Sequence, residues 1–274
     1  MKKRFLGLLI ALFMAVPAFA SVAVSPTRIE INANKIKTNY ITTAIEIKGD
    51  TKELMRFKAY PGFFTINEKG EMVMIDKSND IHDLSKRLRF VPSEFNVAQG
   101  KSQKLRINIA NLNTLPDGES RAVLYIEDVN PKEYAVDTGR QGIGAQLIVK
   151  TRVGVPIYID KGKVKKEAEI EYLNIVKAKD GLYTDMKVLS KGNSKIRYST
   201  SVQIIQGKKL IDEYNLNSKV VGENNYYVDK QKIKTDNIKG AGEYTLRVVV
   251  SYFDENGKRK NIKKETNLII QGNV

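Results

Sequence analysis

Apolar and polar residues alternate with a period of two along most of this chain. Successive side chains of a β-strand point to opposite faces, so this alternation predicts strands that bury one face. The alternating segments are rich in Val, Ile, Thr and Tyr, and Gly, Asn and Asp separate them. Helical periodicity is nearly absent, and residues 79–90 offer at most one or two helical turns. We therefore expect an all-β protein.

The alternating segments form two sets of similar size. The first comprises residues 21–31, 40–49, 54–60, 103–110, 120–129 and 145–159, and the second comprises residues 168–178, 182–190, 196–206, 226–233, 243–253 and 266–271. A short polar stretch, residues 160–163, separates the two sets. Strands at this spacing, with turn residues between them, are typical of antiparallel sandwiches and barrels. We predict two β-sandwich domains, at residues 21–160 and 165–274.

The N-terminus has the three parts of a secretory signal peptide. Basic residues at positions 2–4 precede an apolar run at 5–16, and Ala18-Phe19-Ala20 provides a cleavage site. The apolar run is shorter than the roughly 20 residues that a membrane-spanning helix needs. We interpret residues 1–20 as a cleaved signal peptide and expect an exported protein that is not embedded in a membrane. The chain has no cysteine, so its core must be stable without disulfides.

The formal net charge of the chain is +15. Its basic residues are distributed along the whole sequence, and the densest runs, at 161–166 and 257–264, lie in turn-like contexts. We interpret them as solvated loops and strand faces, and we expect no nucleic-acid partner. Binding to nucleic acid or to an anionic surface is an alternative that rests on charge alone.

Residue types that support catalysis or metal binding are scarce. The only histidine is His82, which lies between Asp80 and Asp83 in a short polar segment. A zinc site or a nucleophile–histidine pair therefore has little to be built from. The segment GRQGIG (139–144) lacks the spacing of a phosphate-binding glycine loop. We expect no enzyme activity, no catalytic or metal-binding residues and no cofactor.

The last apolar segment of the first set is unusually long. One parity carries the apolar residues Ile143, Ala145, Leu147 and Val149, and then Val153, Val155 and Ile157. A polar loop is expected before it, at residues 130–142. An apolar edge strand beside such a loop invites pairing with another chain, whereas the last strand of a sandwich faces its own core. Alternation leaves both interpretations open.

Three blocks stand out in the first half of the chain. They are SVAVSPTRIEI (21–31), VPSEFNVAQGKSQKLRINIA (91–110) and LPDGESRAVLYIEDVNP (115–131). In their order and spacing they resemble the PapD-like periplasmic pilus chaperones. The second half of the chain is similar only in size, strand count and position. The resemblance implies two immunoglobulin-like β-sandwich domains in a boomerang arrangement.

The resemblance also implies a function. Chaperones of this family hold an incomplete pilus or fimbrial subunit in the periplasm by lending it a strand, without ATP. Main-chain hydrogen bonds pair the two chains, and alternate side chains fill the groove of the partner. The donor row would be Ile143, Ala145, Leu147 and Val149. The implied partners are exported pilin-like subunits and an outer-membrane usher, and self-association of the empty protein is left open.

The family anchors the C-terminal carboxylate of the subunit with two basic residues between the domains. Arg28 takes the first position, and a planar guanidinium suits a carboxylate. Gly154 stands where the family has a lysine, and we expect Arg152 to replace it. Glu119 is similar to a glutamate that fixes the angle between the domains, although its usual arginine partner falls at Tyr158. The chain therefore resembles a divergent member.

An exported adhesion or carbohydrate-binding β-sandwich is the alternative function, because one fold serves many functions. Carbohydrate sites usually show exposed aromatic rings. The 13 tyrosines, notably Tyr226 and Tyr227, permit such a site, but tryptophan is absent.

Overall fold

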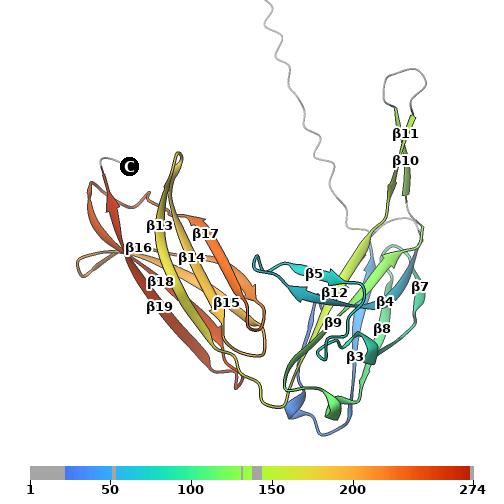
Figure 1. Ribbon diagram of the computed structural model, residues 1–274. Coiled ribbons are helices and arrows are strands. Elements are labelled where there is room, and N and C mark those ends of the chain that lie inside the picture. The colour runs from blue at the N-terminus through green and yellow to red at the C-terminus, as the bar shows by residue number, and fades with distance from the viewer. Residues whose placement is uncertain (1–21, 51–53, 131, 138–143, 272–274) are drawn as a thin grey trace, which may run out of the picture.

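The structure, a computed structural model, describes residues 22–50, 54–130, 132–137 and 144–271. Within these residues the chain forms nineteen β-strands and three short 3-10 turns, and it has no α-helix. The prediction of an all-β chain of two β-sandwiches is confirmed (Figure 1). The expected signal peptide, residues 1–20, lies outside the described residues.

The first domain is a sandwich of two sheets. One sheet has the order β1-β3-β8-β6, with β1 (Val22–Ser25), β3 (Tyr40–Gly49), β8 (Ser102–Ala110) and β6 (Leu88–Val91). The other sheet has the order β2-β12-β9-β4-β5, and a further strand, β7, pairs with β4. The bounds of these strands are β2 (Ile29–Asn32), β12 (Arg152–Lys161), β9 (Gly118–Asp128), β4 (Met55–Ile66), β5 (Met72–Ile75) and β7 (Glu94–Val97). The 3-10 turns are η1 (Ala33–Lys35), η2 (Ser85–Arg87) and η3 (Leu112–Thr114).

Alternate residues of the two sheets meet in one apolar core. Leu105 and Ile107 of β8 enter it from one side, and Leu124 and Ile126 of β9 enter it from the other. All four side chains are buried. Burying each such side chain stabilises the fold by roughly 1.5–3 kcal/mol, which explains how the domain closes without a disulfide.

Two segments that were expected to be single strands are interrupted. Residues 21–31 form β1 and β2, which lie in different sheets and are separated at Pro26, a residue without an N–H for the ladder. Residues 145–159 form β11 (Gly144–Val149) and β12. The strand that pairs with β12, β9, ends at Asp128, so the chain before Arg152 has no neighbouring strand of the sandwich to continue along.

The strand β11 pairs with β10 (Lys132–Asp137), which lies in the segment that was expected to be a loop. The pairing is antiparallel, from Lys132 opposite Val149 to Asp137 opposite Gly144. The two strands form a separate hairpin that projects from the end of the first sandwich (Figure 1). The expectation of one long strand entering the core is therefore wrong for its first part and right for β12.

The second domain contains the sheets β13-β14-β17 and β16-β15-β18-β19. Their strands are β13 (Ala168–Ala178), β14 (Gly181–Ser190), β17 (Tyr226–Lys232), β16 (Lys209–Val221), β15 (Ile196–Gln206), β18 (Gly242–Phe253) and β19 (Arg259–Ile270). The sequence patterns missed β16, because its six charged or amide residues interrupt the apolar alternation and most of its side chains are at least partly exposed. Alternation is visible only where one face is buried.

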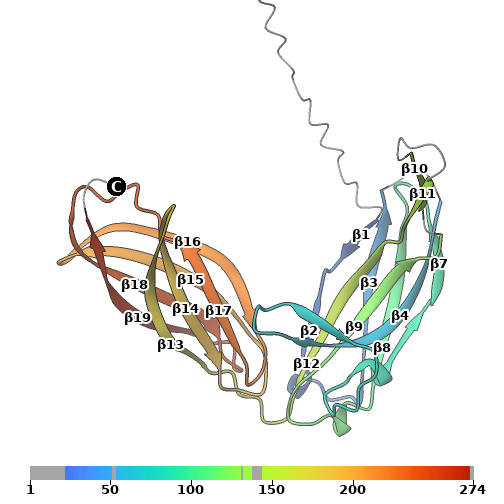
Figure 2. The same ribbon diagram turned by 45° about the horizontal axis from the view of Figure 1, so that its top comes forward.

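Residues 162–167 connect β12 to β13, and the two sandwiches lie at an angle to each other (Figures 1 and 2). One buried core extends from Val22 to Ile159, and a second extends from Ala168 to Ile270. The hairpin of β4 and β5 continues past the edge of the first sandwich and reaches the second domain (Figure 2). The two domains are therefore joined by the linker and also by the contact of this hairpin with the second domain.

Candidate functional site between the two domains

One face of β9 is turned away from the core of the first domain and toward the second. Strand side chains alternate, so this face carries every second residue of β9. These residues are Glu119, Arg121, Val123, Tyr125 and Glu127, and all five are buried. Two carboxylates and one guanidinium on a buried face each require a partner, because an unpaired buried charge is costly.

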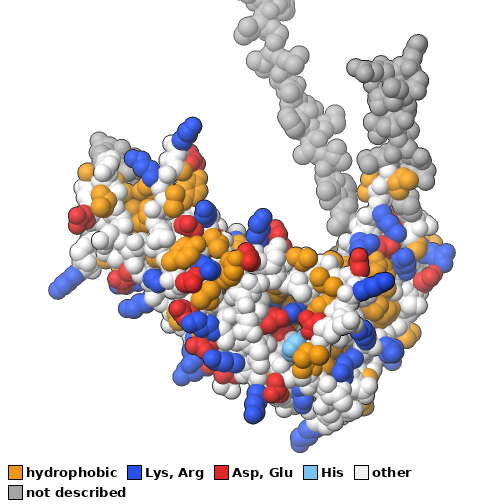
Figure 3. Space-filling model, viewed as in Figure 1, with side chains coloured by type: hydrophobic (Ala, Val, Ile, Leu, Met, Phe, Trp, Pro, Cys, Tyr) orange, Lys and Arg blue, Asp and Glu red, His pale blue; other side chains and the backbone are white. Residues whose placement is uncertain are grey.

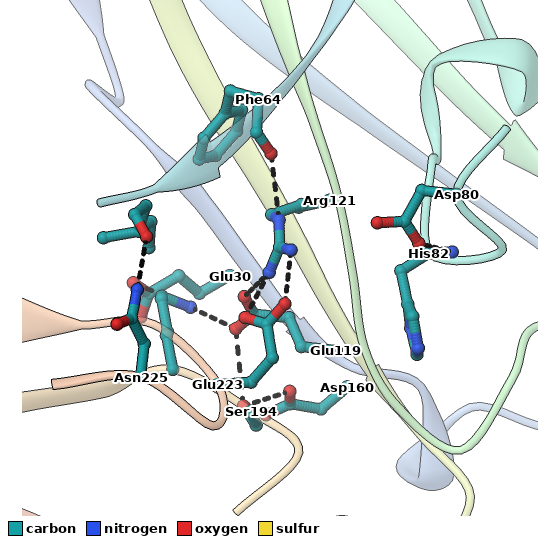
Figure 4. Close-up of polar contacts among 12 residues, drawn as sticks. Glu30, Phe64, Asp80, His82, Glu119, Arg121, Asp160, Ser194, Glu223 and Asn225 are labelled. Atoms are coloured by element: carbon teal, nitrogen blue, oxygen red, sulfur yellow. Dashed lines mark hydrogen bonds and ion pairs between the residues drawn. The ribbon is translucent and has the colours of Figure 1, made fainter. Parts of the chain in front are cut away.

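Glu119 has its partners in the second domain. The ammonium Nζ of Lys195 donates to Oε2 of Glu119 at 2.9 Å, and both side chains are buried. The hydroxyl of Ser194 lies 3.3 Å from the same oxygen and 2.8 Å from Oδ1 of Asp160 (Figure 4). The charge of Lys195 also lies 3.5 Å from the ring centroid of Tyr158, a cation–π contact. Opposite charges from the two domains thus neutralise each other inside the interface.

The ionisation of Glu119 depends on this contact. Burial raises the pKa of Glu119, and the charge and hydrogen bond of Lys195 act against that rise. The hydroxyl of Tyr158, which shares the interface, has its pKa raised to about 12, chiefly by burial and then by the charge of Glu119. Protonation of Glu119, or loss of the Lys195 ammonium, would therefore remove the charge pair that links the two domains.

Arg121 joins three parts of the chain. Its Nε donates to the carbonyl oxygen of Phe64 at 3.0 Å, and its two terminal nitrogens bind both carboxylate oxygens of Glu223 (Figure 4). The planar guanidinium matches a carboxylate in this two-point arrangement. Its backbone N–H donates to the carbonyl of His82 at 2.9 Å. In the space-filling view, acidic side chains gather beside the single histidine, where the domains meet (Figure 3).

The end of the β4–β5 hairpin adds an apolar contact to this interface. Phe64, Val123 and Tyr158 belong to a small buried cluster, against which Val220 of the second domain packs. The amide of Asn225 donates to the carbonyl oxygen of Ile66 at 2.9 Å (Figure 4). The interface therefore combines charge pairs at its centre with apolar packing beside them.

Arg28, the expected first anchor for a carboxylate, lies next to this interface. It immediately precedes β2 and is exposed, and its Nε lies 3.3 Å from Oε1 of Glu30. The same oxygen lies 3.7 Å from Lys195 and 3.7 Å from Arg197. Glu30 therefore links Arg28 of the first domain to two basic residues of the second, in a cleft that Lys166 and Ser251 also line.

Arg152, the expected second anchor, is not brought together with Arg28. The parallel pairing of β12 with β2 sets Ile157 opposite Ile29, so Arg152 lies four residues further along the sheet than the position opposite Arg28. At 3.3 Å a residue this is about 13 Å. Arg152 donates instead to Glu127 at 2.8 Å and lies over the ring of Tyr125, 5.1 Å from its centroid.

The glycine at position 154 has a packing explanation. A Cβ atom there would lie 3.0 Å from a methyl carbon of Val123, and one at Gly62 on the other flanking strand would lie 2.6 Å from the ring of Tyr125. Val123 and Tyr125 therefore spread over both neighbouring strands, and a side chain at either glycine position would require one of them to move. The ring of Tyr60 lies beside that of Tyr125, with centroids 5.1 Å apart. A lysine at 154, which the family pattern would place there, would require Val123 to shift by a few tenths of an ångström.

Glu127 is the centre of a second buried cluster, at the base of the β10–β11 hairpin. Its carboxylate accepts hydrogen bonds from Tyr60 at 2.5 Å and Arg152 at 2.8 Å, and it pairs with Lys150 at 2.5 Å and with Lys58 at 3.4 Å. These partners, Lys150 first, lower the pKa of Glu127 to about 2. Lys150 directly follows β11, so Glu127 ties the hairpin to the sandwich.

The expected donor row falls partly within the described residues. Ile143 lies outside them. The backbone of β11 places Ala145 opposite Val136 and Leu147 opposite Tyr134. The side chains of Ile148 and Val149 are 57% and 43% exposed, so neither enters the core. Among the described strands, β11 pairs with β10 alone, and its second edge has no partner.

Several residues of the interface were not found from the sequence. Lys195 and Glu223 showed no local pattern, and the partners of Glu119 and Arg121 are 76 and 102 residues away in the chain. One signal was available for Arg121 and Glu127. Both are charged residues of a predicted strand, on the parity opposite to Ala122, Leu124 and Ile126.

The likenesses of this chain to known proteins are found among solved structures. No family model and no curated protein matches the sequence. The chain is similar to solved structures of the YadV chaperone (10% identity, TM-score 0.46, covering 90% of this chain and 100% of that one) and of the CupB2 chaperone of Pseudomonas aeruginosa (12%, 0.44, 88% and 98%). A third is the SafA pilin of Salmonella enterica in complex with the SafB chaperone (12%, 0.42, 91% and 96%).

Membrane-spanning helices and metal-binding clusters are both absent from the part of the chain that the structure describes. No helix there is long and apolar enough to cross a membrane. No group of three or more His, Cys, Asp or Glu side chains in that part is arranged to hold a metal ion.

Removing the cation of the interdomain pair should be more harmful than removing the whole pair. Lys195→Met leaves the carboxylate of Glu119 buried beside only the more distant Arg121, and we expect a loss of about 3–5 kcal/mol in the free energy of unfolding. Glu119→Gln combined with Lys195→Met should recover much of it. Urea titration measures both, with Lys191→Met, an exposed lysine, as control. Equal losses in the single and double variants would contradict this dependence.

The Glu127 cluster should give the protein a specific loss of stability in acid. The pKa of Glu127 is lowered from 4.5 to about 2, so its contribution is present above pH 4.5 and is lost as the pH falls toward 2. We expect the difference in Tm between the wild type and Glu127→Gln to be largest near neutral pH and to shrink across this range. Glu46→Gln, at an exposed position of β3, is the control. A difference independent of pH would be inconsistent with a paired, ionised Glu127.

Proposed function

We propose that this protein is a periplasmic chaperone that binds pilus or fimbrial subunits by donating a strand. The observation that carries the proposal is the second edge of β11, which no described strand covers, together with the exposed side chains of Ile148 and Val149. An unpaired edge offers backbone N–H and C=O groups to an incoming chain. The three sequence blocks that resemble PapD-like chaperones support the same function.

The donor row in this proposal is Ile143, Ala145, Leu147 and Val149. Main-chain hydrogen bonds would fix the register, and the larger side chains would each contribute roughly 1.5–3 kcal/mol on entering a dry groove. The Glu127 cluster supports this role because it holds the residues that follow β11, Lys150 and Arg152, against the sandwich. A donor strand held in advance loses less conformational freedom on binding.

Arg28 is the proposed contact for the C-terminal carboxylate of the subunit. Its guanidinium is exposed and pairs at 3.3 Å with Glu30, which is also exposed, so a ligand carboxylate can compete for it. Arg197, near the same glutamate, is a second basic residue within the cleft. Arg152 is a weaker candidate, because Glu127 already engages it about 13 Å along the sheet.

In this proposal the protein is exported to the periplasm, works without ATP or another cofactor, is not an enzyme, and delivers its subunit to an outer-membrane usher. The alternative, a carbohydrate-binding surface module, gains no specific support. Tyr226 and Tyr227 are only partly exposed, and lysine ammonium groups lie 4.3 Å and 5.3 Å from their ring centroids. Neighbouring reading frames for an usher and small exported pilin-like proteins would favour the chaperone.

A charge in the donor row should abolish subunit binding. We expect Val149→Asp to remain folded, because the side chain is exposed, but to lose co-purification of an exported subunit. Ile148→Asp is the matched control, since the neighbouring residue of a strand points to the opposite face. The amount of subunit that co-purifies with each variant from periplasmic extracts is the measurement, and we expect it to fall for Val149→Asp alone. Unchanged capture by Val149→Asp would remove the donor-strand assignment.

Arg28→Ala should weaken binding of a peptide that ends in a free carboxylate. A charge-assisted hydrogen bond contributes about 1.5–3 kcal/mol, so we expect Kd to rise by roughly 10- to 100-fold. The same peptide with an amidated C-terminus should bind both proteins equally weakly. Isothermal titration provides the affinities, and Arg152→Ala serves as the comparison. Equal affinity of wild type and Arg28→Ala for the free acid would exclude Arg28 from the site.

A further inference from the structure

The strand β5 has one free edge and two exposed faces. Among the described strands it pairs only with β4, from Met72 opposite Ile66 to Ile75 opposite Phe63. Met72, Val73 and Met74 are 38%, 41% and 42% exposed, although successive residues point to opposite faces. An apolar ribbon of this kind is unusual on a soluble domain, because an exposed edge of this composition attracts another strand.

The hydrogen-bond pattern of the hairpin determines which groups the free edge offers. The N–H of Asn67 donates to the carbonyl of Glu71 at 3.0 Å, which marks these residues as a hydrogen-bonded pair. In an antiparallel ladder such pairs alternate, so Val73 and Ile75 direct their backbone groups toward β4. Met72 and Met74 therefore direct their N–H and C=O groups outward. These residues are the ones that a further strand would bind.

The edge lacks the usual protection and is held in place at its far end. No lysine, proline or bulge interrupts residues 72–75, and these are the devices that commonly block pairing at an edge. The turn of the hairpin rests on the second domain. Asn225 binds the carbonyl of Ile66, and Gly70 lies so close to Val220 and Tyr227 that a Cβ atom there would be 2.8 Å from the carbonyl oxygen of Val220.

We propose that β5 pairs with β5 of a second copy of this chain, antiparallel and with Met74 opposite Met74. The charges that flank the strand select both the partner and the register. With Met74 on the two-fold axis, Glu71 of each copy lies opposite Lys77 of the other, and both residues are exposed. The outward backbone groups of Met72 and Met74 then face the outward groups of the other strand, as antiparallel pairing requires.

The neighbouring registers that keep the same hydrogen-bond phase are less favourable. Moving the axis to Val73 would set Glu71 opposite Ile75, so its pairing with Lys77 would be lost, and moving it to Ile75 would set Val73 opposite Lys77. The chosen register gives two opposite-charge pairs and an apolar centre. It also satisfies the isologous geometry of a two-fold dimer, in which each contact occurs twice. This interface does not depend on strand donation by β11.

Cysteine crosslinking tests the register directly, because the chain has no cysteine of its own. Opposite residues in a hydrogen-bonded pair have Cα atoms about 5.5 Å apart, within the range that a disulfide bridges. We expect Met74→Cys to form a disulfide-linked dimer under mild oxidation. Met72→Cys is the matched control, with similar exposure but a position about 13 Å from its own copy in this register.

Charge reversal tests the selection of the partner. We expect Lys77→Glu and Glu71→Lys each to raise the dimer Kd by roughly tenfold, and the double exchange Glu71→Lys with Lys77→Glu to restore it, as sedimentation equilibrium would measure. All three variants change exposed residues and should keep the Tm of the wild type. Equal crosslinking at positions 72 and 74, or charge variants without effect, would overturn the proposal. A monomeric protein whose Met74→Cys variant crosslinks only to other proteins would overturn it as well.

Discussion

The charge pair of Glu119 and Lys195 is the interaction on which the arrangement of the two domains depends. Each residue is buried, and each belongs to a different sandwich. Any shift of the domains that parts Glu119 from Lys195 but keeps both side chains away from water would leave two unpaired buried charges. Such unpaired buried charges are strongly unfavourable. The two-point contact of Arg121 with Glu223 is a second charge pair between the domains. These two charge pairs connect the sandwiches in addition to the six-residue linker.

A single strand organises both polar clusters. The outward face of β9 carries Glu119 and Arg121 at the domain interface and Glu127 at the base of the β10–β11 hairpin, and Val123 and Tyr125 fill the space between them. Gly62 and Gly154 on the flanking strands make room for those two side chains. The glycine at 154 is thus part of the packing around β9, and Arg152, the expected replacement for a lysine there, donates to Glu127.

The sequence was most informative where one face of a strand is buried. β3, β13 and β15 lie at the residues that alternation predicted, because their inward residues are apolar and their outward residues are polar. It failed for β10 and β16, where the apolar alternation is weak, and at Pro26, where one apparent strand changes sheets. The partners of Glu119 could not be predicted in the same way. A local pattern shows which side chain is charged, but not which residue some 76 positions later lies opposite.

The continuity of β9 has a mechanical consequence. Glu127 and Glu119 are eight residues apart on one hydrogen-bonded strand, a span of about 27 Å, and β4 and β12 support it on both sides. A load applied to the β10–β11 hairpin enters this strand at Glu127, through Lys150 and Arg152. It leaves the strand at Glu119 and Arg121, where the second domain is attached. One hydrogen-bonded strand therefore connects the contacts at the base of the hairpin with the contacts at the domain interface, and no loop lies between them.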